Sequence, residues 1–149
     1  MNYYSLKNME WQTGLIELDK GIYAYIQPRG GIWFIANAGL IVGRDFSIVI
    51  DSLTNEKMAM DFLSSIRKVT DKPIRFLINT HYHGDHTWTN HLFNAVTISH
   101  VNTRRLIEEE MRTNVIGLYE KLFPRNGFQR CQVYTAGPGL FGIAHALCG

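Results

Sequence analysis

Several features that mark specialised classes of protein are scarce in this sequence. It contains only two cysteines, Cys131 and Cys148, both close to the C-terminal end, and two late cysteines do not make a disulfide framework. No run of about 18 apolar residues is present, so no membrane-spanning segment is expected. The first residues, MNYYSLKNMEWQTG, lack the charged-then-apolar pattern of a signal peptide. We therefore expect a cytoplasmic protein.

The sequence also has little excess of charge. Fifteen basic and thirteen acidic residues leave a formal net charge of +2. A net charge this small, in a chain without a basic run, does not predict a nucleic-acid partner. With 149 residues and 46% hydrophobic content, the chain can bury a core, and a single domain spanning 1–149 is expected.

The last part of the chain lacks acidic residues altogether. From Pro124 onward there is no aspartate or glutamate, while glycine and proline are frequent. Apolar residues show little periodicity there, so the sequence predicts neither a helix nor a strand. We treat 125–149 as a tail that departs from the pattern of the rest.

Elsewhere the apolar pattern predicts alternating strands and helices. The expected strands are 21–28, 33–43, 46–51, 74–80 and 95–99, and the expected helices are 55–69 and 101–123, the second broken near Thr113. A turn at 43–45 predicts a hairpin. Ser52, Thr54 or Asn55 can cap the first helix. A strand, a helix and a strand in succession predict a parallel pair with a right-handed crossover. The expected class is α/β, a sheet with helices on one side.

The feature with most chemical content is the segment THYHGDH, which contains H-x-H-x-D-H at 81–86. It follows an expected strand, at the edge where open α/β sheets bind ligands. In extended backbone, residues two apart point the same way, so His81 and His83 can converge on one cation. Gly84 is expected to let the backbone turn sharply, so that Asp85 and His86 face a second point. Imidazole and carboxylate suit zinc.

Two cations about 3.5–4 Å apart would share a water and lower its pKa to about 7, which makes a hydroxide nucleophile near neutral pH. The alternative is an exposed loop that merely contains four polar residues. Four ligand-type residues within six positions at a strand end favour the metal site.

With these residues in view, the chain resembles the metallo-β-lactamase superfamily. The resemblance rests on NAGLIVG…IVIDS, INTHYHGDHTWTNHLF and AVTISHVNTRR and covers residues 20–110. It implies the N-terminal half of an αβ/βα sandwich, truncated, with a mixed sheet and helices on one face. It implies that His81 and His83 bind one zinc, and that Asp85 and His86 bind a second. Asp85 would also help to move a proton. Asp51 would not bind metal itself but would help to orient the ligating histidines; alternatively, it could simply cap the next helix.

The other histidines have simpler interpretations. His91 is expected on a following helix as a surface or packing residue, and His100 in a structural hydrogen bond. Trp88 and Thr89 stand where family members often carry small residues, which alters the edge of the site without removing a ligand.

The resemblance also indicates what is missing. Family members supply a third histidine to the first metal, and a bridging aspartate or cysteine and a final histidine from a second βα half. His145 is the only histidine after His100, and its spacing fits the third ligand, although Ala-Leu-Cys follows it instead of Thr-x-Gly. Cys148 is a less fitting soft ligand. No Asp, Glu or His follows His145, so the remaining ligands cannot come from downstream in this chain.

Three explanations remain open at this point. The chain is a truncated or frameshifted member, a half-domain that pairs with a second copy, or a fragment that binds metal weakly. A large apolar sheet face drives association, so a homo-oligomer is expected.

The resemblance implies a zinc-dependent hydrolase acting on a small-molecule substrate with an ester-like or amide-like bond, such as a lactone, β-lactam or thioester, through metal-bound hydroxide. Up to two zinc ions are expected. The alternative is a catalytically silent metal-binding fragment. A di-iron oxidoreductase is disfavoured, since its usual pattern places glutamate at the position of His83.

Overall fold

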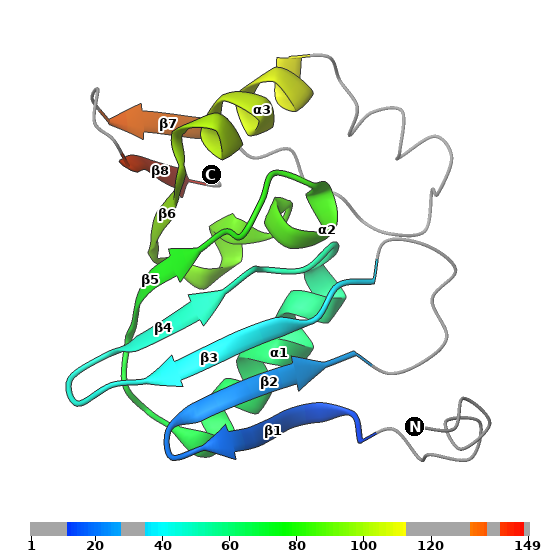
Figure 1. Ribbon diagram of the computed structural model, residues 1–149, viewed down its shortest axis with the longest axis vertical. Helices are drawn as coiled ribbons and strands as arrows, with labels where there is room; N and C mark the ends of the chain where they lie inside the picture. Colours follow the sequence, from blue (N-terminus) through cyan, green and yellow to red (C-terminus); the bar gives the residue numbers. More distant parts are fainter. Residues whose placement is uncertain (1–11, 28–34, 113–131, 137–140, 148–149) are drawn as a thin grey trace, which may run out of the picture.

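The computed structural model describes residues 12–27, 35–112, 132–136 and 141–147, the last two as backbone. The described strands form one eight-stranded sheet in the order β1-β2-β3-β4-β5-β6-β8-β7 (Figure 1). The strands are β1 Gly14–Asp19, β2 Ile22–Ile26, β3 Ala38–Val42, β4 Ser47–Ile50, β5 Ile74–Ile78, β6 Val96–His100, β7 Gln132–Ala136 and β8 Phe141–Leu147. The helices are α1 Glu56–Val69, α2 Gly84–Thr87, the 3-10 helix η2 Asn90–Phe93 and α3 Val101–Arg112.

The sheet is mixed, and its parallel part determines where the histidine motif lies. The pairings from β1 to β4 are antiparallel, whereas β4 with β5 and β5 with β6 are parallel. Ile50 of β4 is in register with Ile78 of β5. Both strands therefore end at the same edge, where Asp51 and Asn79 follow them.

Helix α1 forms because its sequence supplies both a cap and an apolar stripe. The side chain of Asn55 accepts a hydrogen bond from the N–H of Met58 at 3.0 Å, which satisfies one of the free N–H groups of the first turn. Ala59, Phe62 and Ile66 are the buried residues of the helix. They pack in one core cluster that includes side chains of β3, β4 and β5. Figure 1 shows α1 behind the sheet.

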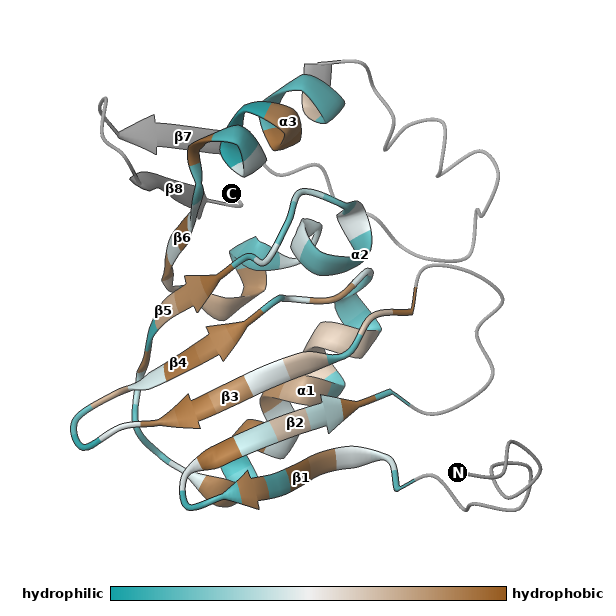
Figure 2. Ribbon diagram, in the orientation of Figure 1, coloured by the Kyte–Doolittle hydropathy of each residue, from teal (hydrophilic) through white to brown (hydrophobic). Residues whose placement is uncertain are grey.

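Alternation along the strands gives the sheet two different faces. Leu40, Val49 and Leu77 are fully buried in the cluster with α1. Their neighbours point the other way because successive side chains in a strand alternate. That second face, which we call the open face, keeps intermediate exposure; it contains Ile41, Ile48, Ile50, Phe76, Ile78 and Ile98. Figure 2 shows apolar colouring along the central strands.

The α/β class, the hairpin at 43–45, the first helix and the parallel pair are confirmed. Asn55 is the N-cap among the three candidates. Strand β1 was not predicted, and β7 and β8 lie in the tail for which the sequence predicted no element. Helix α3 is described as far as Arg112, so the break expected near Thr113 lies outside the described residues. Nothing helical in the described ranges is both long and apolar enough to cross a membrane.

Candidate metal centre

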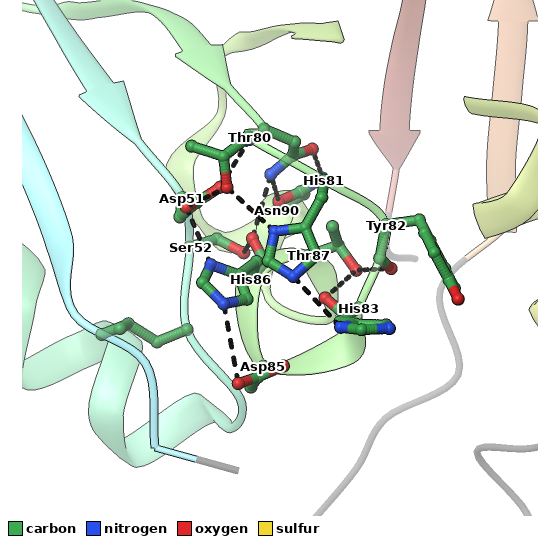
Figure 3. A network of polar contacts seen from close by, with 12 residues as sticks. Asp51, Ser52, Thr80, His81, Tyr82, His83, Asp85, His86, Thr87 and Asn90 are labelled. Carbon is green, nitrogen blue, oxygen red and sulfur yellow. Dashed lines mark hydrogen bonds and ion pairs between the residues drawn. The ribbon is translucent and has the colours of Figure 1, made fainter. Parts of the chain in front are cut away.

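The histidine motif lies where β5 ends, on a bend that leads into the short helix α2 (Figure 3). His81 and His83 precede α2, and His83 is its N-cap residue. Asp85 and His86 are the second and third residues of α2. A strand end and one helical turn therefore bring all four predicted ligands into one small region.

Their donor atoms form two pairs. In the first pair, His81 Nε2 lies 3.1 Å from His83 Nδ1. In the second, His86 Nε2 lies 3.6 Å from Asp85 Oδ2. The pairs are adjacent, since the ring centroids of His81 and His86 are 4.1 Å apart. The His81 and His83 ring centroids are 4.7 Å apart, so the four side chains form one continuous group, and their division between two metal positions stays a prediction.

The buried carboxylate of Asp51 joins this region to β4. Its side chain is 5% exposed. Asp51 Oδ1 accepts the N–H of Thr80 at 2.9 Å, and Oδ2 accepts the Thr80 hydroxyl at 2.7 Å. Oδ2 also lies 2.8 Å from His86 Nδ1. Asp51 therefore contacts the predicted ligand His86 at Nδ1, which leaves Nε2 free of this contact, as expected of a supporting residue. The alternative role as helix cap is filled by Asn55.

The carbonyl oxygen of His86 anchors α2 to the ends of β4 and β5. It accepts hydrogen bonds from the backbone N–H of Ser52 at 3.0 Å, from Ser52 Oγ at 3.2 Å and from Asn79 Nδ2 at 2.9 Å. Asn79 is itself paired with the amide of Asn90. These bonds fix the position of His86 relative to both strands.

The chain after β4 adopts an unusual backbone conformation to make these contacts. Asp51 has φ 59° and Leu53 has φ 82°, in the left-handed region that non-glycine residues rarely occupy. The hydroxyl of Thr89 donates to the carbonyls of Ser52 and Leu53 at 2.5 and 3.1 Å. Thr89 is thus a buried structural residue that holds this strained segment beside the histidines.

Gly84 serves a different purpose from the one expected. It is absent from the glycines with positive φ, which are Gly14 and Gly21 among the described residues, so a sharp left-handed turn is not the reason for glycine here. A Cβ on Gly84 would lie 1.8 Å from Trp88 Cε2. Glycine is required because the indole of Trp88 packs directly on the backbone at this position.

Burial lowers the pKa of His81, and the neighbouring His86 and His83 act in the same direction. A lower pKa keeps the imidazole neutral, which is the form that ligates a metal. On α3, burial raises the pKa of the Glu110 carboxyl, on which His83 and Asp85 also act electrostatically. Glu110 therefore lies near enough to the motif to respond to its charge.

The separations within the pairs fit zinc. Ligands about 2.0–2.2 Å from a tetrahedral zinc lie about 3.3–3.6 Å from each other, close to the 3.1 and 3.6 Å measured here. Within the described part of the chain, no group of three or more His, Cys, Asp or Glu side chains is arranged to hold a metal ion. The described residues therefore supply two pairs of candidate ligands, and neither pair alone completes a metal site.

The structure describes the backbone at His145 but not its side chain. Its backbone lies in β8, opposite Tyr134 of β7. The adjacent Ala144 is in register with Thr97, near the start of β6, whereas the motif follows the C-terminal end of parallel β5. The role of His145 as third ligand stays a prediction, and Cys148 lies outside the described residues.

The two remaining histidines have structural contacts. His91 lies in η2, half-buried, with its ring hydrogen-bonded to the backbone of Trp88. His100 ends β6, and its Nδ1 accepts the N–H of Asn102 at 3.2 Å. Both agree with the interpretations made from the sequence.

Sequence reasoning missed Ser52, Asn79, Thr80 and Asn90. Each is an ordinary polar residue, and only its position next to VID or THYHGDH signalled a connection with the ligands.

Comparison with known proteins extends these observations. The profile of the metallo-beta-lactamase superfamily matches residues 31–140. A metallo-beta-lactamase from Hirschia baltica is 24% identical with a TM-score of 0.53, over 64% of this chain and 47% of that one. One from Erythrobacter litoralis, with beta mercaptoethanol in its active site, is 22% identical with a TM-score of 0.54, over 64% of this chain and 45% of that one.

A third similar structure is FIM-1 from Pseudomonas aeruginosa in the mono-zinc form, 18% identical with a TM-score of 0.53, over 67% of this chain and 47% of that one. No curated protein matches the chain. The chain spans about half the length of these solved structures, and the likeness in each case is one of fold. The profile match covers most of the sequence and includes the whole histidine motif, and the chain therefore belongs to the metallo-beta-lactamase superfamily.

Proposed function

We propose that this chain provides the metal-binding half of a zinc-dependent hydrolase that cleaves an ester-like or amide-like bond in a small molecule, of the lactone, β-lactam or thioester class. Membership of the superfamily supports a metallohydrolase-type function. The observation that carries the proposal is the presence of two donor pairs, 3.1 and 3.6 Å wide, side by side at the end of β5. The mono-zinc form of FIM-1 supports the choice of metal.

Each residue of the centre would have a distinct task. His81 and His83 would hold one zinc ion, and Asp85 and His86 a second. When bound, zinc supplies a Lewis acid for the carbonyl oxygen and lowers the pKa of water. The Asp85 side chain, 20% exposed, is accessible enough to hold a proton and pass it on. Asp51 keeps His86 oriented through Nδ1.

A second candidate is a metal-binding protein without catalytic activity. It is favoured by the absence, among the described residues, of any group of three or more side chains that could hold a metal ion. Both candidates require metal, and only the first requires turnover.

The deciding experiment measures zinc content by elemental analysis and hydrolysis of a panel of lactone, β-lactam and thioester substrates on the same preparation. About two zinc ions per chain with turnover supports the hydrolase. About one or fewer without turnover supports the silent metal-binding protein.

His83→Ala tests the ligand set itself. Because it removes one donor of the first pair, we expect bound zinc to fall measurably. His100→Ala is the matched control, since His100 is an exposed histidine outside both pairs and should leave zinc content unchanged. Equal zinc content in His83→Ala and the unmodified protein would contradict the assignment.

A further inference from the structure

The hydroxyl of Thr80 lies between the buried carboxylate and a histidine of the first pair. Thr80 Oγ1 is 2.7 Å from Asp51 Oδ2 and 3.1 Å from His81 Nδ1. The same Asp51 oxygen is 2.8 Å from His86 Nδ1 in the second pair. We propose that Thr80 is a positioning residue that relays the effect of Asp51 to His81, so that one buried carboxylate fixes the tautomer of one histidine in each donor pair. The importance of these tautomers for metal binding rests on the proposed function, whereas the tautomers can be tested without any metal.

The direction of each hydrogen bond follows from what the groups can donate. An ionised carboxylate only accepts, and a threonine hydroxyl has one proton. Thr80 must therefore donate that proton to Asp51 Oδ2. Its oxygen then has only lone pairs to offer His81, so His81 Nδ1 must carry the proton of that ring.

The opposite arrangement fails at the carboxylate. If Thr80 donated to His81 Nδ1, two oxygens 2.7 Å apart, one of them in a buried carboxylate, would face each other without a proton between them. A charged acceptor in such a place needs its hydrogen bonds. The hydroxyl proton therefore belongs on the side of Asp51.

The same reasoning applies directly to His86, whose Nδ1 must donate to Asp51 Oδ2. His81 and His86 then both present Nε2 as a bare lone pair. In each of these two histidines, Nε2 is the ring nitrogen that faces the other member of its donor pair. One residue, Asp51, thus prepares both metal positions, directly in one case and through Thr80 in the other.

His83 differs from the other two. With His81 Nε2 unprotonated, the 3.1 Å contact with His83 Nδ1 requires the proton to be on His83. His83 must move that proton before it can ligate through Nδ1, whereas His81 and His86 are already in the form required. On metal binding, His81 and His86 would therefore keep their tautomers, whereas His83 would change its own.

The test uses the metal-free protein with ¹⁵N-labelled histidine, at a pH where the rings are neutral, and reads the protonation of each ring nitrogen from its chemical shift. In the unmodified protein we expect His81 and His86 to be protonated at Nδ1. Thr80→Val removes the hydroxyl at constant shape and should release His81 to a mixture of tautomers, while His86 keeps its own. Thr80→Ser restores the hydroxyl and should restore the His81 signals.

Thr87→Val is the matched control. Thr87 is the last residue of α2, and among the described residues its hydroxyl donates to the carbonyls of Tyr82 and His83 and makes no contact with the His81 ring, so its loss should leave the His81 nitrogen signals unchanged. Zinc titration gives a second measurement. Loss of a group that orients a ligand typically lowers metal affinity about 10–100-fold, and we expect a loss at the lower end of this range for Thr80→Val, with recovery in Thr80→Ser.

Two results would overturn the relay. One is an unmodified protein in which His81 is protonated at Nε2, a measurement that needs no variant to fold. The other is a folded Thr80→Val protein with His81 signals identical to those of the unmodified chain. Failure of the proposed function is recognised separately: the tautomers would be as predicted, which supports the relay, and the protein would bind no zinc.

Discussion

At the scale of single residues, Gly84 shows how tightly the motif is packed. The Cβ of an alanine at this position would lie 1.8–2.3 Å from three atoms of the Trp88 indole. Trp88 is four residues ahead, on the next turn, so the ring and the backbone at Gly84 form one packed unit. The size of the side chain that position 84 can accept therefore depends on the side chain at position 88.

We expect Gly84→Ala to destabilise the fold by about 1–3 kcal/mol, the usual cost of forcing extra carbon into packed space. The measurement is the free energy of unfolding by denaturant titration. Gly39→Ala is the matched control, since its Cβ would make an ordinary contact 3.4 Å from Ile50 Cβ.

The double variant Gly84→Ala with Trp88→Ala tests the cause. If the clash with the indole is responsible, adding Gly84→Ala to Trp88→Ala should cost much less than adding it to the unmodified protein. Equal costs in the two backgrounds would refute this explanation.

The four ligand candidates could be picked out from the sequence because their residue types and spacing are themselves the signal. His81, His83, Asp85 and His86 lie within six positions after a predicted strand. The supporting residues could not be predicted so readily, because their function depends on distant contacts. Thr80 and Asp51 are 29 residues apart, and Ser52 and His86 are 34 apart. No local pattern encodes such a pair.

At the scale of elements, α1 could be predicted with its boundaries because cap and periodicity agree. Strand β1 was harder, since it lies at the sheet edge and its register shifts between Glu17 and Asp19. Helix α2 has four residues, too few for a period to be visible. Strand β8 pairs with β6, and β7 pairs with β8, and local sequence does not reveal such pairing.

The cap of α1 gives a prediction for this scale. Asn55→Ala removes the side-chain oxygen that accepts the N–H of Met58, and we expect a loss of about 1 kcal/mol. Asn55→Asp keeps an acceptor at the same place and should retain most of the stability. Thermal unfolding of the three proteins followed by circular dichroism provides the comparison, and equal midpoints for Asn55→Ala and the unmodified chain would contradict a capping role.

At the scale of the whole molecule, the two faces of the sheet are unequal. The face toward α1 contains fully buried side chains such as Leu40 and Val49. The open face has six large apolar residues of intermediate exposure side by side on β3 to β6. Continuous apolar surfaces of this kind mark sites of association.

We propose that a second copy of this chain covers the open face. Light scattering coupled to gel filtration should then give a dimer or larger species, and Ile48→Glu should shift it toward the monomer by placing a charge in the contact. Met60→Glu is the control, because Met60 is 53% exposed on α1. A monodisperse monomer with little binding of a dye for apolar surfaces would contradict this proposal.

The connection between Asp51 and His86 also has a consequence for the order of folding. The hydrogen bonds that join the donor pairs to their supporting residues lie between Asp51 and Asn90, and the longest, from Asp51 to His86, spans 35 residues. The entropic cost of closing a loop of this length rises only slowly with its length, and none of these contacts requires a residue after Asn90. During synthesis, in which N-terminal parts fold first, the unit β4–α1–β5–α2 can therefore assemble the ligand pairs before β6, α3 and the strands that follow have left the ribosome.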